Sequence, residues 1–225
     1  MKPFSFVFFI STTIILELAR AVFKSFSRYN LIMTADLYQK AFDNYGESPK
    51  ALHWVNYASQ AVRFKHLVSD LELEDKTILD AGCGMGDILP FIYARTERFD
   101  YLGIDTNEDF IAVAKKRYAG HSFKVGDPFF GNLRRRFEVV LCSGVMNENK
   151  PDWLNLRKRM IAHLFDAATE TLAFNMAGAF HYIPPDAKIA YADAQAIYDY
   201  CRSLTSQVSI KTGYSPYDFT IVMQK

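Results

Sequence analysis

Three glycines that alternate with other residues, directly after a short apolar run, are the strongest constraint on the fold of this chain. Residues 77–87 read Thr-Ile-Leu-Asp-Ala-Gly-Cys-Gly-Met-Gly-Asp. The apolar, β-branched run is typical of a buried strand, and glycines let the backbone turn sharply and approach a ligand because they have no Cβ. A helix that begins beyond them offers free backbone N–H groups to an anionic group. The pattern predicts a strand, a nucleotide-type glycine turn and a helix start.

Stretches with strand and helix periodicity alternate through the rest of the chain. The predicted strands are Thr77–Leu79, Phe99–Ile104, Ser122–Val125, Phe137–Cys142, Thr171–Asn175, Val208–Lys211 and Phe219–Met223. The predicted helices between them are Ile88–Ile92, Phe110–Arg117, Trp153–Phe165 and Ala190–Leu204. This alternation indicates a Rossmann-like, doubly wound α/β sheet of seven mostly parallel strands. Because only a short loop joins the final two strands, the last strand is expected to be antiparallel.

Helices are also expected before the first strand. Residues 35–45 have helical spacing, and a second helix is predicted from Pro49 to Leu67, with Ser48 as its N-cap. From this position the two helices could cover a ligand pocket. There is no break in composition and no repeat after Met33, so residues 33–225 are expected to form a single domain.

Composition narrows the function classes. The formal net charge is +1, which gives no global field to attract nucleic acid or an anionic membrane. Three cysteines without close pairing suggest reduced thiols in a cytoplasmic protein. The five histidines are scattered and none stands at ligand spacing from a cysteine or another histidine, so no metal site is expected.

The N-terminal residues 4–16 are strongly apolar and follow Lys2. This run is shorter than the roughly 20 residues of a membrane-spanning helix, and its length suits the core of a signal peptide better. Three interpretations remain open: a membrane anchor or signal, a helix that packs on the body or lies on a membrane surface, and a biological chain that begins at Met33. We favour the third. Membrane association through residues 4–16 is expected only if the extension 1–32 belongs to the protein.

Polar residues stand where the predicted strands end, and ligands of doubly wound sheets bind at the carboxyl ends of the strands. Asp105 lies twenty-five positions after Asp80, the rough spacing of an acid that accepts hydrogen bonds from two ribose hydroxyls, although it could also cap the next helix. Asp127 could bind an adenine amino group or act as a turn residue. The strand ends carry Asp80, Asp105, Asp127, Ser143 and Asn175.

The glycine pattern separates two nucleotide classes. A dinucleotide fingerprint would have its third glycine at position 87. This chain has Asp87 there, and its third glycine is Gly86. The acid Asp80 also ends the strand close to where a pyrophosphate would lie. A carboxylate repels phosphates and attracts an ammonium or sulfonium group, so the electrostatics favour a cationic adenosine ligand over NAD.

The sequence resembles the class I S-adenosylmethionine-dependent methyltransferases. Three motifs carry the resemblance: residues 78–86, Tyr-Leu-Gly-Ile-Asp at 101–105 and Val-Gly-Asp at 125–127. The resemblance implies a seven-stranded sheet and S-adenosylmethionine as cofactor. It also implies roles for single residues. The methionine moiety would lie on Asp80 and the backbone of Gly82, Gly84 and Gly86, the ribose on Asp105, the adenine on Asp127 and Pro128 or Phe129, and the region near the sulfonium on Ser143 and Gly144. Thr106 is a further candidate for cofactor binding.

Residues upstream of the first strand resemble a small prokaryotic subgroup of these methyltransferases, which makes Tyr45, Gln60 and Arg63 candidates to close over the cofactor. Arg63 would pair with the cofactor carboxylate, or it could simply lie on the solvent face of its helix. Glu148 and His181 are candidate general bases, with ordinary loop residues as the alternative.

Methyl transfer from a sulfonium is an in-line displacement that requires alignment of the acceptor. Ser143 to Glu148 stand where enzymes that methylate DNA adenine or glutamine carry Asn/Asp-Pro-Pro-Tyr/Phe, so these substrates and nucleic acid are not expected. The expected protein is a methyltransferase acting on a small, partly apolar molecule. The alternatives are a non-catalytic S-adenosylmethionine-binding protein and an NAD-binding Rossmann protein.

Overall fold

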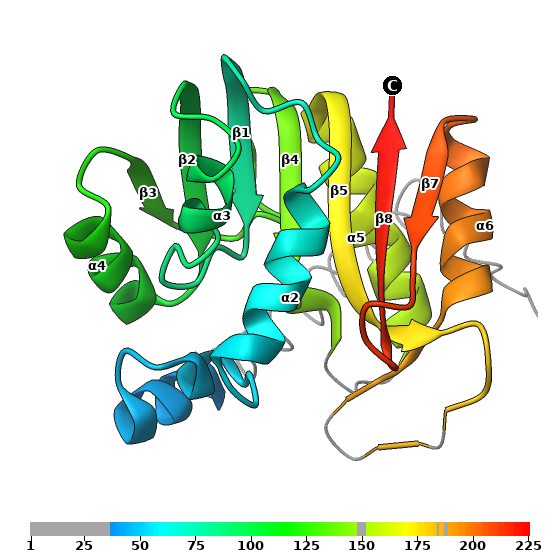
Figure 1. Ribbon diagram of the computed structural model, residues 1–225, viewed down its shortest axis with the longest axis horizontal. Coiled ribbons are helices and arrows are strands. Elements are labelled where there is room, and N and C mark those ends of the chain that lie inside the picture. Colours follow the sequence, from blue (N-terminus) through cyan, green and yellow to red (C-terminus); the bar gives the residue numbers. More distant parts are fainter. Residues whose placement is uncertain (1–36, 148–151, 184, 187–188) are drawn as a thin grey trace, which may run out of the picture.

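A mixed β-sheet forms the centre of the protein, and the computed structural model describes residues 37–147, 152–183, 185–186 and 189–225 (Figure 1). The strand order is β3-β2-β1-β4-β5-β8-β7. Strands β1 to β5 run parallel, and β8 is antiparallel to both of its neighbours, β5 and β7. The strands are β1 Lys76–Ala81, β2 Phe99–Asp105, β3 Ser122–Val125, β4 Phe137–Ser143, β5 Ala168–Ala179, β7 Val208–Lys211 and β8 Asp218–Gln224. The predicted doubly wound sheet with an antiparallel last strand is confirmed.

Helices cover both faces of the sheet. Helices α2 (Tyr57–Val68), α3 (Leu89–Tyr93) and α4 (Glu108–Arg117) pack on one face, and α5 (Trp153–Ala167) and α6 (Ala194–Leu204) on the other (Figure 1). Successive strand residues therefore enter different cores. In β4, Val139 and Leu141 pack with α2 and α3, whereas Val140 and Cys142 pack with α5 and α6. Burial on both faces explains why the central strands read as continuous apolar runs.

The segment before the first strand differs from its prediction. Residues 37–45 are helical as expected, but the helix predicted from Pro49 to Leu67 is broken. A short 3-10 helix, η1 (Pro49–Leu52), ends at His53, which has a φ of 58°, and α2 begins four residues later. Asn56 and Ser59 form a reciprocal capping box, which fixes the start of α2. Ser48 precedes η1 but makes no side-chain capping bond.

The last helix begins later than predicted, because a two-residue strand that the sequence did not predict precedes it. Strand β6 (Ala192–Asp193) pairs with the end of β5, and α6 starts at Ala194 rather than at Ala190. The Asp193 side chain accepts hydrogen bonds from the backbone N–H groups of Gln195 and Ala196 and so caps α6. This cap sets the true start of the helix.

The predicted boundary at Met33 and the apolar extension 1–32 lie outside the described residues. In the described ranges, no helix combines the length and the apolarity that crossing a bilayer requires.

Candidate functional site

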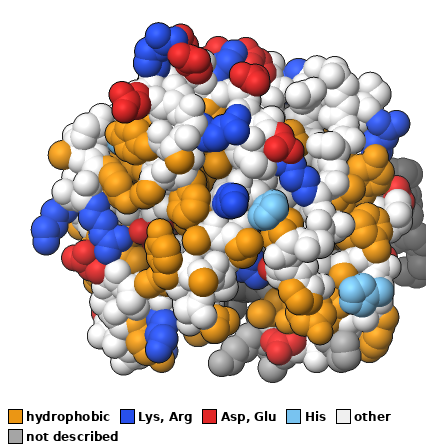
Figure 2. Space-filling model, in the orientation of Figure 1, with side chains coloured by type: hydrophobic (Ala, Val, Ile, Leu, Met, Phe, Trp, Pro, Cys, Tyr) orange, Lys and Arg blue, Asp and Glu red, His pale blue; other side chains and the backbone are white. Residues whose placement is uncertain are grey.

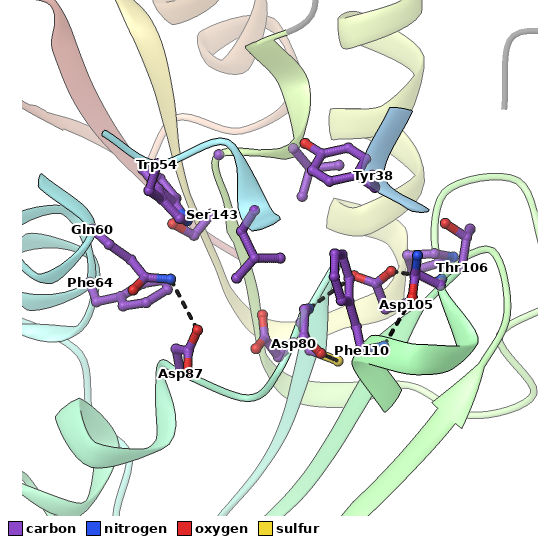
Figure 3. A pocket seen from close by; sticks show the side chains of 18 of the residues that line it. Tyr38, Trp54, Gln60, Phe64, Asp80, Asp87, Asp105, Thr106, Phe110 and Ser143 are labelled. Atoms are coloured by element: carbon purple, nitrogen blue, oxygen red, sulfur yellow. Dashed lines mark hydrogen bonds between the residues drawn. The ribbon is translucent and has the colours of Figure 1, made fainter. Parts of the chain in front are cut away.

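A cavity opens at the carboxyl ends of β1 to β4. The strand order reverses between β1 and β4, because the chain continues from β1 to β2 on one side of this pair and from β4 to β5 on the other. This is the topological switch point at which doubly wound folds bind ligands. The segment before β1 covers the cavity, so its walls come from six separate parts of the chain (Figure 3). The lining residues are Tyr38, Leu52, Trp54, Gln60, Phe64, Asp80, Gly82, Cys83, Gly84, Asp87, Asp105, Thr106, Asn107, Phe110, Pro128, Phe129, Ser143, Gly144 and Val145.

The glycine turn forms the floor of the cavity and leaves no room for side chains. The φ angles of Gly82 and Gly84 are +80° and +53°, which L-residues with a Cβ rarely adopt. A Cβ on Gly82 would lie 2.4 Å from Val145 Cγ2, and one on Gly84 would lie 2.8 Å from Leu52 Cδ2. Both side chains thus rest directly on the backbone of the turn. The backbone of Gly82 is fixed from below because its N–H donates to the Ile104 carbonyl at 2.8 Å.

Asp105 joins the end of β2 to the glycine turn. Its Oδ2 accepts a 2.9 Å hydrogen bond from the Gly84 N–H, and its Oδ1 accepts one of 2.9 Å from the Asn107 N–H. Desolvation raises the pKa of this carboxyl, and the bonds from the backbone N–H groups oppose the rise. Each carboxylate oxygen has a further lone pair, so Asp105 can still accept hydrogen bonds from a ligand.

Asp80 lies at the centre of the cavity floor and is almost fully buried. Its Oδ2 accepts a 2.7 Å hydrogen bond from the hydroxyl of Tyr101, a residue of β2. Burial raises the pKa of Asp80 to about 7, the Tyr101 hydrogen bond opposes this rise, and the nearby charges of Asp105 and Asp87 add to it. A cationic ligand would favour the ionised form and lower this pKa.

A third carboxylate, Asp87, follows the glycine turn and also faces the cavity. Its Oδ2 accepts a 3.2 Å hydrogen bond from Gln60 Nε2 of α2, and its Oδ1 pairs with Arg117 at 3.0 Å. Desolvation raises the pKa of Asp87, and both partners oppose this. The cavity therefore holds three acids, and no Lys or Arg is among its lining residues in the described part of the chain.

The turn after β4 forms the opposite wall. Asn175 Oδ1, at the end of β5, accepts hydrogen bonds from Ser143 Oγ at 3.1 Å and from the Gly144 N–H at 3.0 Å. Asn147 Nδ2 donates to the Gly144 carbonyl, and its Oδ1 accepts from the Ala177 N–H. Two asparagines thus hold this turn, although neither lines the cavity.

The covering segment is attached to α4 by polar and aromatic contacts. Gln39 donates to Asp109 at 2.7 Å and accepts from Asn107 at 3.0 Å. The ring centroid of Phe110 lies 6.1 Å from that of Tyr38 and 5.6 Å from that of Phe42. Farther along, the ion pair between Arg117 and Glu47 measures 3.0 Å. The expectation that the N-terminal helices could cover a pocket is confirmed.

Most predicted cofactor-binding residues come together in this cavity. Its lining includes Asp80, Gly82, Gly84, Asp105, Thr106, Pro128 and Ser143. Gly86 is not part of it, because a Cβ there would face Tyr118 and Phe123 under the turn. Gln60, proposed from the upstream resemblance, does line the cavity, whereas Tyr45 is exposed outside it.

Arg63 does not face the cavity, contrary to the prediction that it binds a cofactor carboxylate. Its guanidinium pairs with Asp218 at 2.6 Å, and its Cζ lies 4.5 Å from the centroid of the Trp54 ring. Asp218 is buried at the start of β8, so an unpaired charge there would be costly. The solvent-face alternative is also wrong, because Arg63 is engaged in this ion pair beneath Trp54.

Three other predicted residues fall outside the cavity or the description. Asp127 Oδ1 accepts hydrogen bonds from the Phe129 and Phe130 N–H groups, so Asp127 organises the turn that positions Pro128, and its contact with adenine stays a prediction. His181 is exposed and does not line the cavity. Glu148 lies outside the described residues. In the described ranges, no group of three His, Cys, Asp or Glu residues is placed to hold a metal ion.

The sequence reasoning missed several lining residues. Leu52 and Phe110 carry only a helical apolar signal, and Tyr38 stands in a predicted helix far from the glycines. In the sequence, Asp87 stands out only because it is not glycine. The one available signal was its place directly after the turn, at the start of the next helix.

Comparison with known proteins agrees with this geometry. Residues 78–167 match the family described as "Methyltransferase domain". The "Putative methyltransferase Rv1506c" of Mycobacterium tuberculosis is 27% identical over 161 residues, which cover 66% of this chain and 93% of that protein. The "Putative methyltransferase 235L" of Invertebrate iridescent virus 6 is 30% identical over 83 residues, 36% of this chain and 31% of its own length.

Solved structures share the fold at low sequence identity. The magnesium protoporphyrin IX methyltransferase ChlM from Synechocystis, with bound SAM, superposes with a TM-score of 0.55 at 19% identity, over 76% of this chain and 85% of ChlM. A DhpI–SAH complex gives a TM-score of 0.60 at 11% identity, over 83% of this chain and 91% of DhpI. The chain therefore has the Rossmann-like fold of these solved methyltransferases. Residues 78–167 match a methyltransferase domain, in agreement with the class I S-adenosylmethionine-dependent family that the motifs indicated.

Proposed function

We propose that this cavity binds S-adenosylmethionine and that the protein transfers its methyl group to a small-molecule acceptor. The observation that carries the proposal is the set of three carboxylates, Asp80, Asp87 and Asp105, around a glycine turn in a cavity whose lining has no basic side chain in the described ranges. Such a site attracts a cationic adenosine compound and repels the pyrophosphate of NAD. The solved neighbours ChlM, with bound SAM, and DhpI, in a complex with SAH, support the same cofactor.

The residues present fit this cofactor. The backbone of Gly82 and Gly84 allows close approach, Asp105 keeps spare acceptor capacity for ribose hydroxyls, and Pro128 and Phe129 offer apolar surface to an adenine ring. Leu52 and Val145 rest on the turn, so we expect both side chains to shift when the cofactor binds. When bound, S-adenosylmethionine supplies a methyl group on a cationic sulfur, and its transfer to an acceptor is an in-line displacement.

In this reaction the contribution of the chain is alignment and exclusion of water. Trp54 lies over Gly144, since a Cβ at that glycine would be 2.8 Å from the Trp54 ring. Trp54, Phe64 and Val145 give the Ser143 side of the cavity an apolar wall, and we expect the acceptor to lie along it. Glu148 remains a candidate general base, whereas the exposed position of His181 does not favour that role.

Two observations favour a small acceptor. On the face drawn in Figure 2, basic and acidic side chains are interspersed, and no broad basic patch suited to a nucleic acid forms there. Two solved neighbours also act on small molecules or in their biosynthesis: ChlM is a magnesium protoporphyrin IX methyltransferase, and PhzM, with a TM-score of 0.62 at 12% identity, is a pyocyanin biosynthetic protein.

Calorimetric titration of the full chain with S-adenosylmethionine and S-adenosylhomocysteine tests the proposal. We expect micromolar binding of both, and binding of neither would refute it. A screen of metabolites with methyl-labelled cofactor would then identify the acceptor. Asp105→Ala is the control variant, and label transfer that survives this substitution would contradict the ribose assignment.

A further inference from the structure

We propose that Trp54 is the specificity-determining residue for the methyl acceptor, because its ring limits the space in which the acceptor reacts. The protein would then accept only molecules with a slender reacting group, meaning one that is terminal and unbranched or that forms the edge of a flat ring. This inference rests on the proposed function and adds the class of acceptor to it.

Trp54 lies at the end of the cavity where the acceptor is expected. Figure 3 places Asp105 at one end of the cavity and Gln60 at the other, and Trp54 and Ser143 belong to this Gln60 end. A Cβ on Gly144 would lie 2.8 Å from Cη2 and 2.9 Å from Cζ2 of the Trp54 ring. The ring thus rests on the Gly144 backbone, with no space for a further layer of atoms between them. An acceptor must enter beside the ring, along the Ser143 side.

Charge and packing hold the Trp54 ring in place. The guanidinium carbon of Arg63 lies 4.5 Å from the centroid of the ring, which is cation–π geometry. Arg63 is anchored in turn to the buried carboxylate of Asp218 on β8, at 2.6 Å. The Phe64 ring meets Trp54 edge-on, with 6.3 Å between the centroids. Because moving the ring away from Gly144 would break these contacts, the space beside it is not easily enlarged.

Asn175 fixes the spacing between the two sides of this space. It is a polar residue of β5 with an exposed fraction of only 1%. Its Oδ1 accepts a hydrogen bond from the Gly144 N–H at 3.0 Å, and its Nδ2 donates to the Arg63 carbonyl at 3.4 Å. One buried side chain thus connects the turn beneath Trp54 with the helix that carries Arg63. Asn175 does not line the cavity, so it is a positioning residue.

A packing role is the competing explanation, in which Trp54 only attaches the covering segment to the sheet. Ligands that differ in the substituent on sulfur separate the two explanations. In an in-line displacement the acceptor atom approaches the methyl carbon from the side opposite the sulfur. A longer S-alkyl chain therefore extends into the volume that the acceptor atom uses. Its affinity measures that volume without knowledge of the acceptor.

The experiment is calorimetric titration of the full chain with S-adenosylhomocysteine, S-adenosylmethionine and the S-allyl homologue of S-adenosylmethionine. We expect the wild type to bind the allyl homologue at least about tenfold more weakly than S-adenosylmethionine, a usual effect of overpacking a filled site. Trp54→Ala should reduce this ratio of affinities to less than about twofold. It should change the affinity for S-adenosylhomocysteine, which has no alkyl substituent of this kind, by less than about threefold. Trp54→Leu should give an intermediate ratio, and it is the second variant if Trp54→Ala folds poorly.

Asn175→Asp tests the positioning residue. This variant keeps Oδ1 as an acceptor and replaces the Nδ2 donor with an oxygen that repels the Arg63 carbonyl. We expect the ratio to fall by about threefold, since the spacing is no longer fixed. The added charge acts on both sulfonium ligands alike and cancels in the ratio. An unchanged ratio would overturn the positioning role of Asn175.

Tyr57→Ala is the matched control, because Tyr57 is an exposed aromatic residue of the covering segment that does not line the cavity. It should leave the ratio unchanged. The inference is overturned, and the proposed function left intact, if the wild type binds both sulfonium ligands equally or if the Trp54 variants keep the full ratio. A ratio that falls as far in Tyr57→Ala would overturn it too, because a general loosening of the cover would then be the cause. A wild-type chain that binds neither S-adenosylmethionine nor S-adenosylhomocysteine would instead refute the proposed function, and this inference with it.

Discussion

The two ends of the cavity are built in different ways. At the Asp105 end, consecutive strands deliver the groups, and backbone N–H groups of Gly84 and Asn107 fix the carboxylate. At the Gln60 end, the walls come from segments far apart in the sequence, and contacts made by side chains such as Gln60 and Asn175 connect them. Gln60 and Asp87 are 27 residues apart, and Asn175 reaches the turn after β4 from 32 residues beyond Ser143.

This difference separates what the fold determines from what the individual chain determines. The parallel sheet brings the carboxyl ends of β1 and β2 together in any chain with this topology. The opposite end depends on how the covering segment packs, and nothing in the sheet specifies that packing. We therefore expect adenosine recognition to depend on the fold, and acceptor specificity to be set at the apolar wall of Trp54 and Val145.

The largest effect is expected from Gly82→Ala. A Cβ at this position would lie 2.4 Å from Val145 Cγ2, and the φ of +80° is strained for alanine. We expect cofactor affinity to fall by more than about a hundredfold, because a methyl group would fill the surface that the cofactor must approach. Calorimetric titration with S-adenosylhomocysteine measures this.

The control is Gly120→Ala, since a Cβ there would have no heavy atom within 4 Å. It should leave affinity unchanged. Similar affinities for the wild type and Gly82→Ala would mean that the ligand does not rest on the glycine turn.

The sequence predicted the fold well because local signals and tertiary structure agree there. The apolar runs at Ile78–Leu79 and Val139–Leu141 are buried on both faces, so their composition alone identified them as strands. The prediction was wrong where short polar side chains set the boundaries. The capping box of Asn56 and Ser59 and the cap at Asp193 divide or shorten helices that apolar periodicity had extended.

The Asp105 end of the site was predictable because local sequence signals agree with the tertiary structure there too. Acids at strand ends are visible in the sequence, and the fold brings them together. Arg63 shows why the Gln60 end of the cavity was not predictable from the sequence. Helical spacing cannot tell whether its guanidinium faces the cavity or Asp218, because the partner lies on β8, at the other end of the chain. Side-chain pairing between distant segments requires the structure.

The second-largest effect is expected from breaking the ion pair between Arg63 and Asp218. Arg63→Met would leave the Asp218 carboxylate, whose side chain is 5% exposed, without its partner. We expect the free energy of unfolding to fall by about 2 kcal/mol, less than for a fully buried pair because Arg63 is partly exposed. Urea denaturation measures this. Adding Asp218→Asn should restore part of the loss, and strictly additive effects of the two substitutions would show that the pair does not contribute as a unit.

A smaller effect is expected from pH. Burial raises the pKa of Asp80 to about 7, so the ionised fraction of this carboxyl rises from roughly a tenth at pH 6 to roughly nine tenths at pH 8. S-adenosylmethionine should bind the ionised form, and its affinity should rise by up to about tenfold over this range. Because the folded state holds this proton more tightly than the unfolded state, Asp80 should also lower stability as pH rises from about 4 through 7.

Asp80→Asn tests the assignment, since it should flatten the pH profile of S-adenosylmethionine binding. An equally steep profile in this variant would assign the titration to another group.

The smallest effect is expected from removing the Arg117 contacts that attach the segment covering the cavity. Arg117 contacts Glu47 of the cover and Asp87 of the glycine turn, both at 3.0 Å. Arg117→Gln should loosen the cover and raise the dissociation rate of S-adenosylhomocysteine by about threefold, in keeping with partly exposed ion pairs. Arg98→Gln is the matched control, because Arg98 also bridges two carboxylates, Glu74 and Asp75, but does so away from the cavity. Stopped-flow displacement compares the two variants. If both leave the dissociation rate unchanged, the cover is held by its contacts with Phe110 and not by Arg117, and the Gln60 end of the cavity would be as firmly built as the Asp105 end.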